Sequence, residues 1–234
     1  MTHTNKVIVI TGAAGNLGSA VAKKFDHPSN RIALIDLNEE RLEEVKNTLQ
    51  CEAASFPVNL MDITAVSQTV KDIIEKFENI DVLANVAGGF TMGPFLHDTP
   101  EKDWNFMFDL NARSVFNMCH AIIPHMRNQG SGRVINIAAR AAKEGKAKMG
   151  PYCASKAAVI TLTETLSAEN RMNNINVNCI LPGTIDTPQN RQDMPDANFD
   201  HWVPPEAIAE VIAFLASDAA VAVSGAAIPV YGKS

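Results

Sequence analysis

A tyrosine and a lysine stand four residues apart, at Tyr152 and Lys156, in a stretch whose pattern predicts a helix. Side chains with this spacing lie on the same face of a helix. An ammonium near a phenol favours the phenolate and lowers the pKa of the phenol from about 10. The pair therefore predicts a tyrosine that gives or takes a proton near neutral pH. A core tyrosine beside a solvated lysine is the alternative.

The strand before this pair ends without a polar side chain. The run 134–137 has the pattern of a buried strand, and Ala138 and Ala139 follow it. A polar partner for the tyrosine is expected at such a strand end, but no serine or threonine occurs between Ser131 and Ser155. The sequence leaves open whether this site is intact, modified or inactive.

A glycine-rich turn follows the first apolar run of the chain. Gly12, Gly15 and Gly18 lie between the predicted strand 7–10 and the predicted helix 16–26. Glycines in such a turn let the backbone approach a pyrophosphate, and the helix N-terminus offers N–H donors and a positive dipole end. We expect a dinucleotide to bind here. A plain strand-to-helix turn is the alternative.

An acidic residue closes the second predicted strand. Asp36 stands 24 residues after Gly12. A carboxylate at this place accepts hydrogen bonds from an adenosine ribose diol and repels a 2′-phosphate. Leu37 and Asn38 bring no cation, and Arg41 lies a helical turn further along. We therefore expect NAD(H) as the cofactor, with NADP(H) less favoured, and a solvated loop aspartate is the alternative.

Apolar strand-like runs alternate with amphipathic helical patterns along the chain, which indicates a parallel sheet covered on both faces. We expect an α/β, doubly wound, Rossmann-like three-layer fold with a central parallel sheet of about seven strands. Residues 1–234 would form a single domain, with a short substrate lid at about 186–203. The predicted strands are 7–10, 32–35, 53–58, 82–84, 134–137, 175–181 and 226–230. The predicted helices are 16–26, 38–49, 62–78, 103–128, 152–171 and 205–216.

Composition argues against several classes of protein. The net charge of −6 argues against a general nucleic-acid binder. No apolar run approaches the roughly 18 residues of a membrane span. The four cysteines form no close pair, and the N-terminus leads straight into a strand. We therefore expect reduced thiols, no targeting peptide and a cytoplasmic location. The scattered histidines predict no metal site.

These motifs resemble those of the short-chain dehydrogenase/reductase family, and the resemblance covers nearly the whole chain. Besides the glycine turn, the matching stretches are Asn85-Val86-Ala87-Gly88, Asn111 in Leu-Asn-Ala-Arg, Tyr152-x-x-x-Lys156, and Pro182-Gly183-Thr184-Ile185-Asp186-Thr187-Pro188. The resemblance implies an oxidoreductase that transfers a hydride between a nicotinamide and a carbonyl/alcohol or quinonoid small-molecule substrate. It also implies a homodimer or homotetramer in which helices 103–128 and 152–171 pair between subunits.

The resemblance implies roles for individual residues. Tyr152 would be the acid/base, and Lys156 would lower its pKa and hold the nicotinamide ribose. Asn111 would hold a water that links Lys156 to solvent, and Thr187 would contact the nicotinamide amide. Besides Tyr152 and Lys156, the expected cofactor-binding residues are Gly12, Gly15, Asn16, Leu17, Gly18, Asp36, Asn59, Leu60, Asn85, Ala87, Gly88, Pro182, Gly183, Ile185 and Thr187.

Two departures from the family pattern concern the site. Asn16 takes the place of a glycine, and asparagine is the residue other than glycine that best tolerates a positive φ. The catalytic serine of the family usually stands thirteen residues before the tyrosine, where this chain has Ala139. Losing one such donor costs about 2.7–4 kcal/mol in other enzymes. Three interpretations stay open: a substrate that needs one donor, replacement of the hydroxyl by Arg140 or a water, or nucleotide binding without turnover.

Three alternative functions follow. Dihydropteridine reductases keep the tyrosine and lysine, have alanine at the serine position and reduce a quinonoid pterin with NADH, so a similar enzyme is one alternative. A 3-oxoacyl carrier-protein reductase is another, and Ala139 argues against it. A catalytically impaired nucleotide-binding regulatory or scaffold protein is a third, from a different class.

A basic cluster precedes the tyrosine. Arg140, Lys143, Lys146 and Lys148 lie within nine residues, with Glu144 as the one acid among them. The loop borders the substrate pocket in this fold, so the cluster suggests an anionic substrate. A solvated charge run is the alternative.

Overall fold

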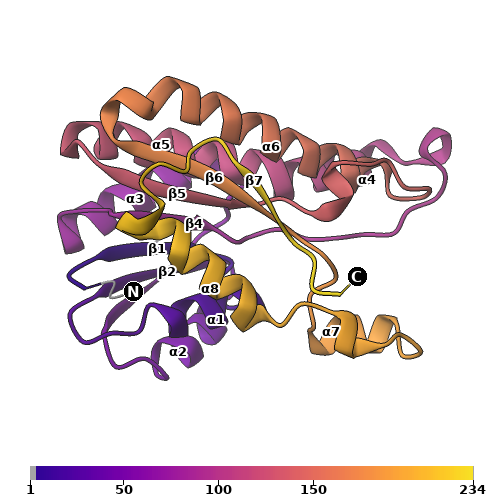
Figure 1. The fold of residues 1–234 in the computed structure, drawn as a ribbon, viewed down its shortest axis with the longest axis horizontal. Coiled ribbons are helices and arrows are strands. Elements are labelled where there is room, and N and C mark those ends of the chain that lie inside the picture. The colour runs from indigo at the N-terminus through magenta and orange to yellow at the C-terminus, as the bar shows by residue number, and fades with distance from the viewer. Residues whose placement is uncertain (1–3, 234) are drawn as a thin grey trace.

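The computed structural model describes residues 4–233, and these form a seven-stranded sheet in which every neighbouring pair of strands is parallel (Figure 1). Along the sheet the strands follow the order β3-β2-β1-β4-β5-β6-β7. Because β1 lies next to β4, the winding of the chain reverses there, and such a switch point opens a crevice at the carboxyl ends of the strands. The strands are β1 (Val7–Thr11), β2 (Arg31–Asp36), β3 (Glu52–Pro57), β4 (Val82–Asn85), β5 (Gly132–Ile137), β6 (Ile175–Pro182) and β7 (Ala227–Val230).

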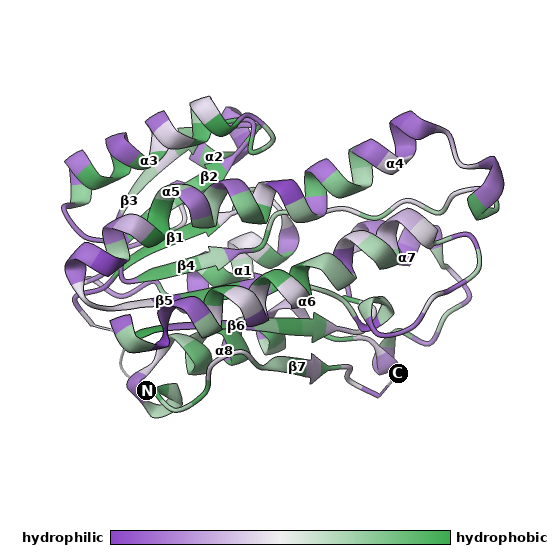
Figure 2. Ribbon diagram, turned by 90° about the horizontal axis from the view of Figure 1, so that it is seen from above, coloured by the Kyte–Doolittle hydropathy of each residue, from purple (hydrophilic) through white to green (hydrophobic). Residues whose placement is uncertain are grey.

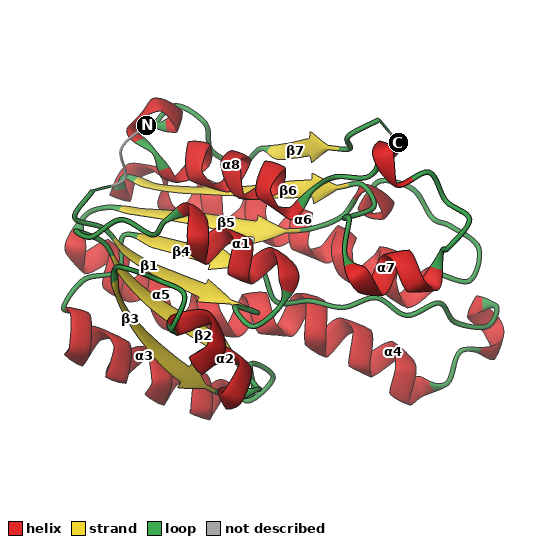
Figure 3. Cartoon of the chain, turned by 90° about the horizontal axis from the view of Figure 1, so that it is seen from below, coloured by secondary structure: helices red, strands yellow, loops and turns green. Residues whose placement is uncertain are grey.

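Helices cover both faces of the sheet (Figures 1 and 3). The helices α1 (Asn16–Lys24), α2 (Glu39–Lys46) and α8 (Pro205–Ala216) pack on one face. The helices α3 (Ile63–Phe77), α5 (Ser114–Gln129) and α6 (Gly150–Asn170) pack on the other. Neighbouring strand residues alternate between the two cores, so Ile8 joins the first and Val9 the second. Most strand residues are therefore apolar on both faces, and β6 and β7 are largely green in Figure 2.

The predicted doubly wound, three-layer fold with about seven parallel strands is confirmed. All five residues of β1 are buried, because each side of the strand faces a layer of helices. No helix within residues 4–233 is long and apolar enough to cross a membrane.

The predicted helix 103–128 corresponds to an unbroken helical run, but this run is not α-helical throughout. It comprises α4 (Glu101–Phe108), a π-helical turn at Asp109–Arg113 and α5 (Ser114–Gln129). A π turn takes one more residue per hydrogen-bonded ring than an α turn, so it rotates the side chains that follow. Periodicity does not reveal such a change, because the apolar pattern continues through it.

Every strand points toward the same end of the molecule, where α7 (Pro188–Asp193) and the start of α4 lie (Figure 3). The segment 186–203, predicted as a lid, contains α7 and a short 3-10 turn at Phe199–His201. Ile185 and Val203 pair in an isolated parallel bridge, so the segment leaves and returns at one place. Its action as a lid stays a prediction.

Candidate active site

The glycine-rich turn lies between β1 and α1. Gly12 has a φ of +65°, and a Cβ built on it would lie 2.8 Å from the Cα of Ala87. A Cβ on Gly18 would lie 2.1 Å from the carbonyl oxygen of Gly12. Only glycine fits at these two positions, so the backbone stays close enough for a phosphate to reach the N–H groups at the start of α1.

Asn16 does not use the positive φ that asparagine tolerates. Asn16 is the first residue of α1, and Gly12 is the one residue of the turn 12–18 with a positive φ. The helix begins directly after Gly15, so Asn16 needs only the ordinary helical conformation.

The Asp36 carboxylate is held at the end of β2 by backbone N–H groups. One oxygen accepts from Ala14 at 3.2 Å, and the other accepts from Leu37 at 2.7 Å and from Asn38 at 3.3 Å. No ion pair joins Asp36 to a cation within residues 4–233. The arrangement places an uncompensated carboxylate beside the glycine-rich turn.

The π-helical turn presents Asn111 to the end of β4. Its side chain is fully buried. The amide oxygen accepts from the Gly89 N–H at 2.9 Å, and the amide nitrogen donates to the Gly89 carbonyl and to the Ser155 hydroxyl, each at 3.1 Å. Asn111 thereby ties the loop after β4 to α6.

Lys156 is buried on α6 and points at the same loop. Its ammonium donates to the Ile137 carbonyl at 2.8 Å. A Cβ built on Gly88 would lie 2.9 Å from both Lys156 Nζ and Asn111 Oδ1. These two polar atoms therefore both lie against Gly88, and a larger residue there would displace the ends of both side chains. Burial lowers the pKa of Lys156 to about 8.

Tyr152 lies on the first turn of α6. Burial and, to a smaller extent, the neighbouring Cys153 raise the pKa of Tyr152 to about 12. The expected lowering of this pKa by Lys156 is therefore wrong for the protein described here. The physical reason is that Lys156 donates to the Ile137 carbonyl, while desolvation of the phenolate dominates at Tyr152. The centroids of the Phe90 and Tyr152 rings lie 5.0 Å apart, and the two rings are nearly perpendicular.

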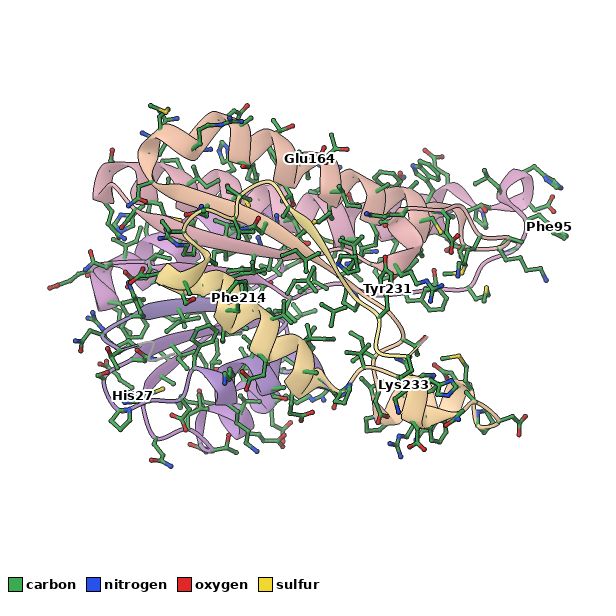
Figure 4. The ribbon with its side chains drawn as sticks, in the orientation of Figure 1. His27, Phe95, Glu164, Phe214, Tyr231 and Lys233 are labelled. Carbon is green, nitrogen blue, oxygen red and sulfur yellow. The ribbon has the colours of Figure 1, made fainter. Side chains whose placement is uncertain are left out.

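The end of β5 presents alanine to the site edge of the sheet. Ala138 donates its N–H to the Ile180 carbonyl, which leaves Ala139 as the first residue beyond the strand ladder. Ala139 is buried and extended, with a φ of −163°. The Arg140 guanidinium lies 5.1 Å from the centre of the Tyr231 ring. Tyr231 directly follows β7 and is labelled in Figure 4.

The predicted basic cluster does not converge on one point. Lys146 pairs with Glu144 at 3.4 Å, whereas the Lys148 ammonium lies 5.5 Å from the centre of the Phe95 ring. Phe95 lies at the tip of the molecule in Figure 4, well away from the Tyr231 ring that holds Arg140. An anion can therefore meet Arg140 or Lys148, but not the whole cluster.

Comparison with known proteins assigns the family. A family model described as short chain dehydrogenase matches residues 6–198 of this chain. The chain belongs to this family. Dehydrogenase/reductase SDR family member 6 from Rattus norvegicus is 35% identical over 242 residues, covering 97% of this chain and 96% of that protein. The 3-oxoacyl-[acyl-carrier-protein] reductase FabG from Thermotoga maritima is 32% identical, covering 99% and 98%.

Solved structures agree with this family. The crystal structure of NAD+-bound xylitol dehydrogenase superposes with a TM-score of 0.90 at 29% identity, covering 99% of this chain and 100% of that one. Levodione reductase superposes with a TM-score of 0.90 at 27% identity, covering 99% and 98%. The protein is an oxidoreductase of the short-chain type.

Three further residues predicted to bind the cofactor, Asn59, Leu60 and Asn85, differ in exposure. Asn59 is exposed after β3, and its amide oxygen accepts from the Met61 N–H at 3.1 Å. Leu60 is nearly buried, and its carbonyl accepts from Asn117 at 2.8 Å. Asn85 is buried, and its amide donates to Asn136 at 2.9 Å. Asn85 therefore links β4 to β5 inside the protein.

The predicted contacts for the nicotinamide end follow β6. Gly183 donates its N–H to the Val230 carbonyl at 2.9 Å, which joins this stretch to the C-terminal segment. The Thr187 hydroxyl accepts from the Asn190 N–H at 3.2 Å and so caps α7. The end of β6 and the start of α7 lie at the end of the molecule toward which the strands point (Figure 3), and the cofactor contacts predicted for Pro182, Gly183 and Thr187 stay predictions.

Three residues near the site were missed at the level of sequence. Phe90 follows Gly88-Gly89, and an aromatic residue directly after two glycines in this family motif was a usable signal. Ser155 lies inside the Tyr152-x-x-x-Lys156 motif, which was a usable signal, but its hydrogen bond with Asn111 was not predicted. Tyr231 carried no signal, because its contact with Arg140 joins distant parts of the chain.

Proposed function

We propose that this protein is an NAD(H)-preferring oxidoreductase that transfers a hydride between a nicotinamide and a carbonyl/alcohol or quinonoid substrate, with Tyr152 as acid/base. The observation that carries the proposal is the meeting of Lys156 Nζ and Asn111 Oδ1 at Gly88, beside the helix turn that bears Tyr152. A buried ammonium without a carboxylate partner costs stability, and such groups concentrate at functional sites.

The residues at the switch point fit a nicotinamide dinucleotide, which supplies or accepts the hydride when bound. The close backbone approach at Gly12 and Gly18 leaves no room for side chains and would let a pyrophosphate reach the start of α1. Asp36 would accept hydrogen bonds from ribose hydroxyls, and its charge would oppose a 2′-phosphate. The bound NAD+ named for the xylitol dehydrogenase structure supports this choice.

The chain's own groups would handle the proton. Tyr152 would give its phenol proton to the substrate oxygen in reduction and take it back in oxidation. Lys156, with a pKa of about 8, is protonated at neutral pH and would hold ribose hydroxyls. Asn111 would fix the loop at Gly89 and hold a water beside Lys156.

Ala139 favours one class of substrate over another. A saturated ketone develops a localised alkoxide that benefits from two donors, whereas a quinonoid substrate spreads its charge over a conjugated system. A dihydropteridine-reductase-like enzyme is therefore the second candidate. The relative from Thermotoga maritima favours a 3-oxoacyl carrier-protein reductase, against which Ala139 argues. A non-catalytic nucleotide-binding scaffold is the remaining alternative.

An anionic substrate, as predicted from the basic cluster, would be bound by one cation and not by the whole cluster. Arg140 directly follows Ala139 and has no acidic partner within residues 4–233, so it is the cation best placed to meet a substrate carboxylate. The single domain, the homodimer or homotetramer and the cytoplasmic location stay predictions.

Asp36→Ala should weaken NADH binding by about ten- to a hundredfold, because it removes a charged hydrogen-bond acceptor. NADPH binding should fall less or improve, since the repulsion of the 2′-phosphate is removed as well. Calorimetric titration of both nucleotides measures the change, with Asp36→Asn as the control that keeps the shape of the side chain. Tight NADPH binding and absent NADH binding in the wild-type protein would contradict the assignment.

A substrate panel tests catalysis. NADH oxidation should be measured with a quinonoid dihydropterin, a quinone and a β-keto thioester. We expect the quinonoid compounds to react fastest and Tyr152→Phe to lose this turnover while still binding NADH. Binding of NADH without turnover of any compound would favour the scaffold alternative.

A further inference from the structure

Phe90 brings an aromatic ring to the proposed acid/base. Its ring centroid lies 5.0 Å from that of Tyr152, and the ring planes are 86° apart. This edge-to-face arrangement is a favoured geometry for two aromatic rings. Phe90 nevertheless remains 50% exposed, so part of its ring is bare beside the phenol.

The backbone that carries this ring is fixed. Gly89 donates its N–H to Asn111 Oδ1 at 2.9 Å and accepts from Asn111 Nδ2 at 3.1 Å. A Cβ built on Gly89 would lie 2.7 Å from Leu110 Cδ2, so the helix side chain packs directly on this glycine. The residue before Phe90 is therefore clamped by the same asparagine that meets Lys156.

The chain stays apolar and exposed beyond this ring, at Met92, Phe95 and Leu96. Gly93 donates its N–H to the Lys148 carbonyl at 2.9 Å, so the segment before α4 is bonded to the segment before α6. The two segments run side by side toward the tip where Figures 1 and 4 show α4 and Phe95. The exposed apolar side chains therefore come from the segment before α4, and the Lys148 ammonium of the other segment lies 5.5 Å from the centre of the Phe95 ring.

Resting on the proposed function, we propose that Phe90 determines the class of substrate by packing the exposed part of its ring against a flat, conjugated ring next to the Tyr152 hydroxyl. Aromatic pairs gain energy beyond the area they bury, and a puckered saturated ring cannot make this contact. In the reduction of a quinone, one hydride and one proton give the hydroquinone. Both electrons travel with the hydride from the reduced nicotinamide, and Tyr152 supplies the proton.

Menadione and 1-decalone distinguish flat from puckered substrates, because both have two fused six-membered rings and a carbonyl group. Binding of each to the full-length protein is measured by calorimetry with saturating NAD+, so that no turnover occurs. Phe90→Leu should weaken menadione binding about 2- to 12-fold and leave 1-decalone binding within about 2-fold. Phe106→Leu is the matched control, since its ring is 47% exposed on α4, and it should change neither.

Phe90→Tyr keeps the ring and should keep the menadione affinity, which separates loss of the ring contact from disturbance of the segment. Three results would each overturn the role of Phe90. Phe90→Leu could weaken the binding of both probes equally, or leave menadione binding unchanged. The wild-type protein could also fail to bind menadione. The proposed function is judged by a separate readout, the oxidation of NADH by menadione. Absent turnover of menadione and of every compound in the substrate panel contradicts the proposed function, while the binding ratio still decides the role of Phe90.

Discussion

Ala139→Ser should raise kcat/KM for a simple saturated ketone by about a hundredfold to a thousandfold, with NADH as reductant. A hydroxyl at the end of β5 would add a second hydrogen bond to the developing alkoxide, beside the one from Tyr152. The φ of −163° at Ala139 is extended backbone that serine adopts without strain. Initial rates of NADH oxidation with cyclohexanone measure the gain.

The neighbouring residue supplies the control for this experiment. Ala138 is also buried, and its N–H belongs to the ladder with Ile180. Successive side chains of an extended segment point to opposite sides, so Ala138→Ser should bring no gain. Menadione turnover should change little in either variant. An unchanged rate for cyclohexanone in Ala139→Ser would mean that Arg140 or a water already supplies the second donor.

Much of the fold could be predicted because strand and helix patterns are local. Every residue of β1 and β6 is buried, and such runs occur where both faces of a sheet are covered. The π turn at Asp109–Arg113 was not predictable from periodicity, since it changes the hydrogen-bonding partner without changing the apolar pattern. The strand order that creates the switch point was not predicted, because it depends on the pairing of β1 with the distant strand β4.

The candidate site was predictable where a residue type carries its own chemistry, as at Asp36 and Tyr152. It was not predictable where contacts depend on packing. Whether the pKa of Tyr152 is raised or lowered depends on how far the fold excludes water from the phenol. The spacing in the sequence indicated only the effect of Lys156. The contact between Arg140 and Tyr231 likewise exists only because β7 lies beside β6.

The burial of Lys156 in the candidate site lowers the stability of the folded protein. Lys156 is 4% exposed, and its Nζ donates to a backbone carbonyl, without an ion pair to any acid within residues 4–233. A buried charge held only by a neutral dipole is worse solvated than in water. The lysine is therefore expected to be retained for function at the expense of stability.

Lys156→Met should make the protein more stable while reducing turnover about a hundredfold or more. The pKa of Lys156 falls from 10.5 to about 8, and this shift corresponds to a cost of about 3 kcal/mol for the charged form. Methionine has a similar length and no charge, so unfolding should require about 2–3 kcal/mol more at pH 7. Urea denaturation measures the gain, and NADH oxidation measures the loss.

The pH dependence of this gain identifies its cause. Below about pH 8 the lysine is protonated in both the folded and unfolded wild-type chains, so the full cost of the buried charge is present. Between about pH 8 and 10.5 the folded protein has lost the proton while the unfolded chain keeps it, so wild-type stability rises with pH relative to the variant. The advantage of Lys156→Met should therefore be largest at pH 7 and nearly absent at pH 10.5, and Tyr152 is present in both proteins, so its own titration largely cancels. An advantage that persists at pH 10.5 would show that packing, not charge, makes Lys156 costly.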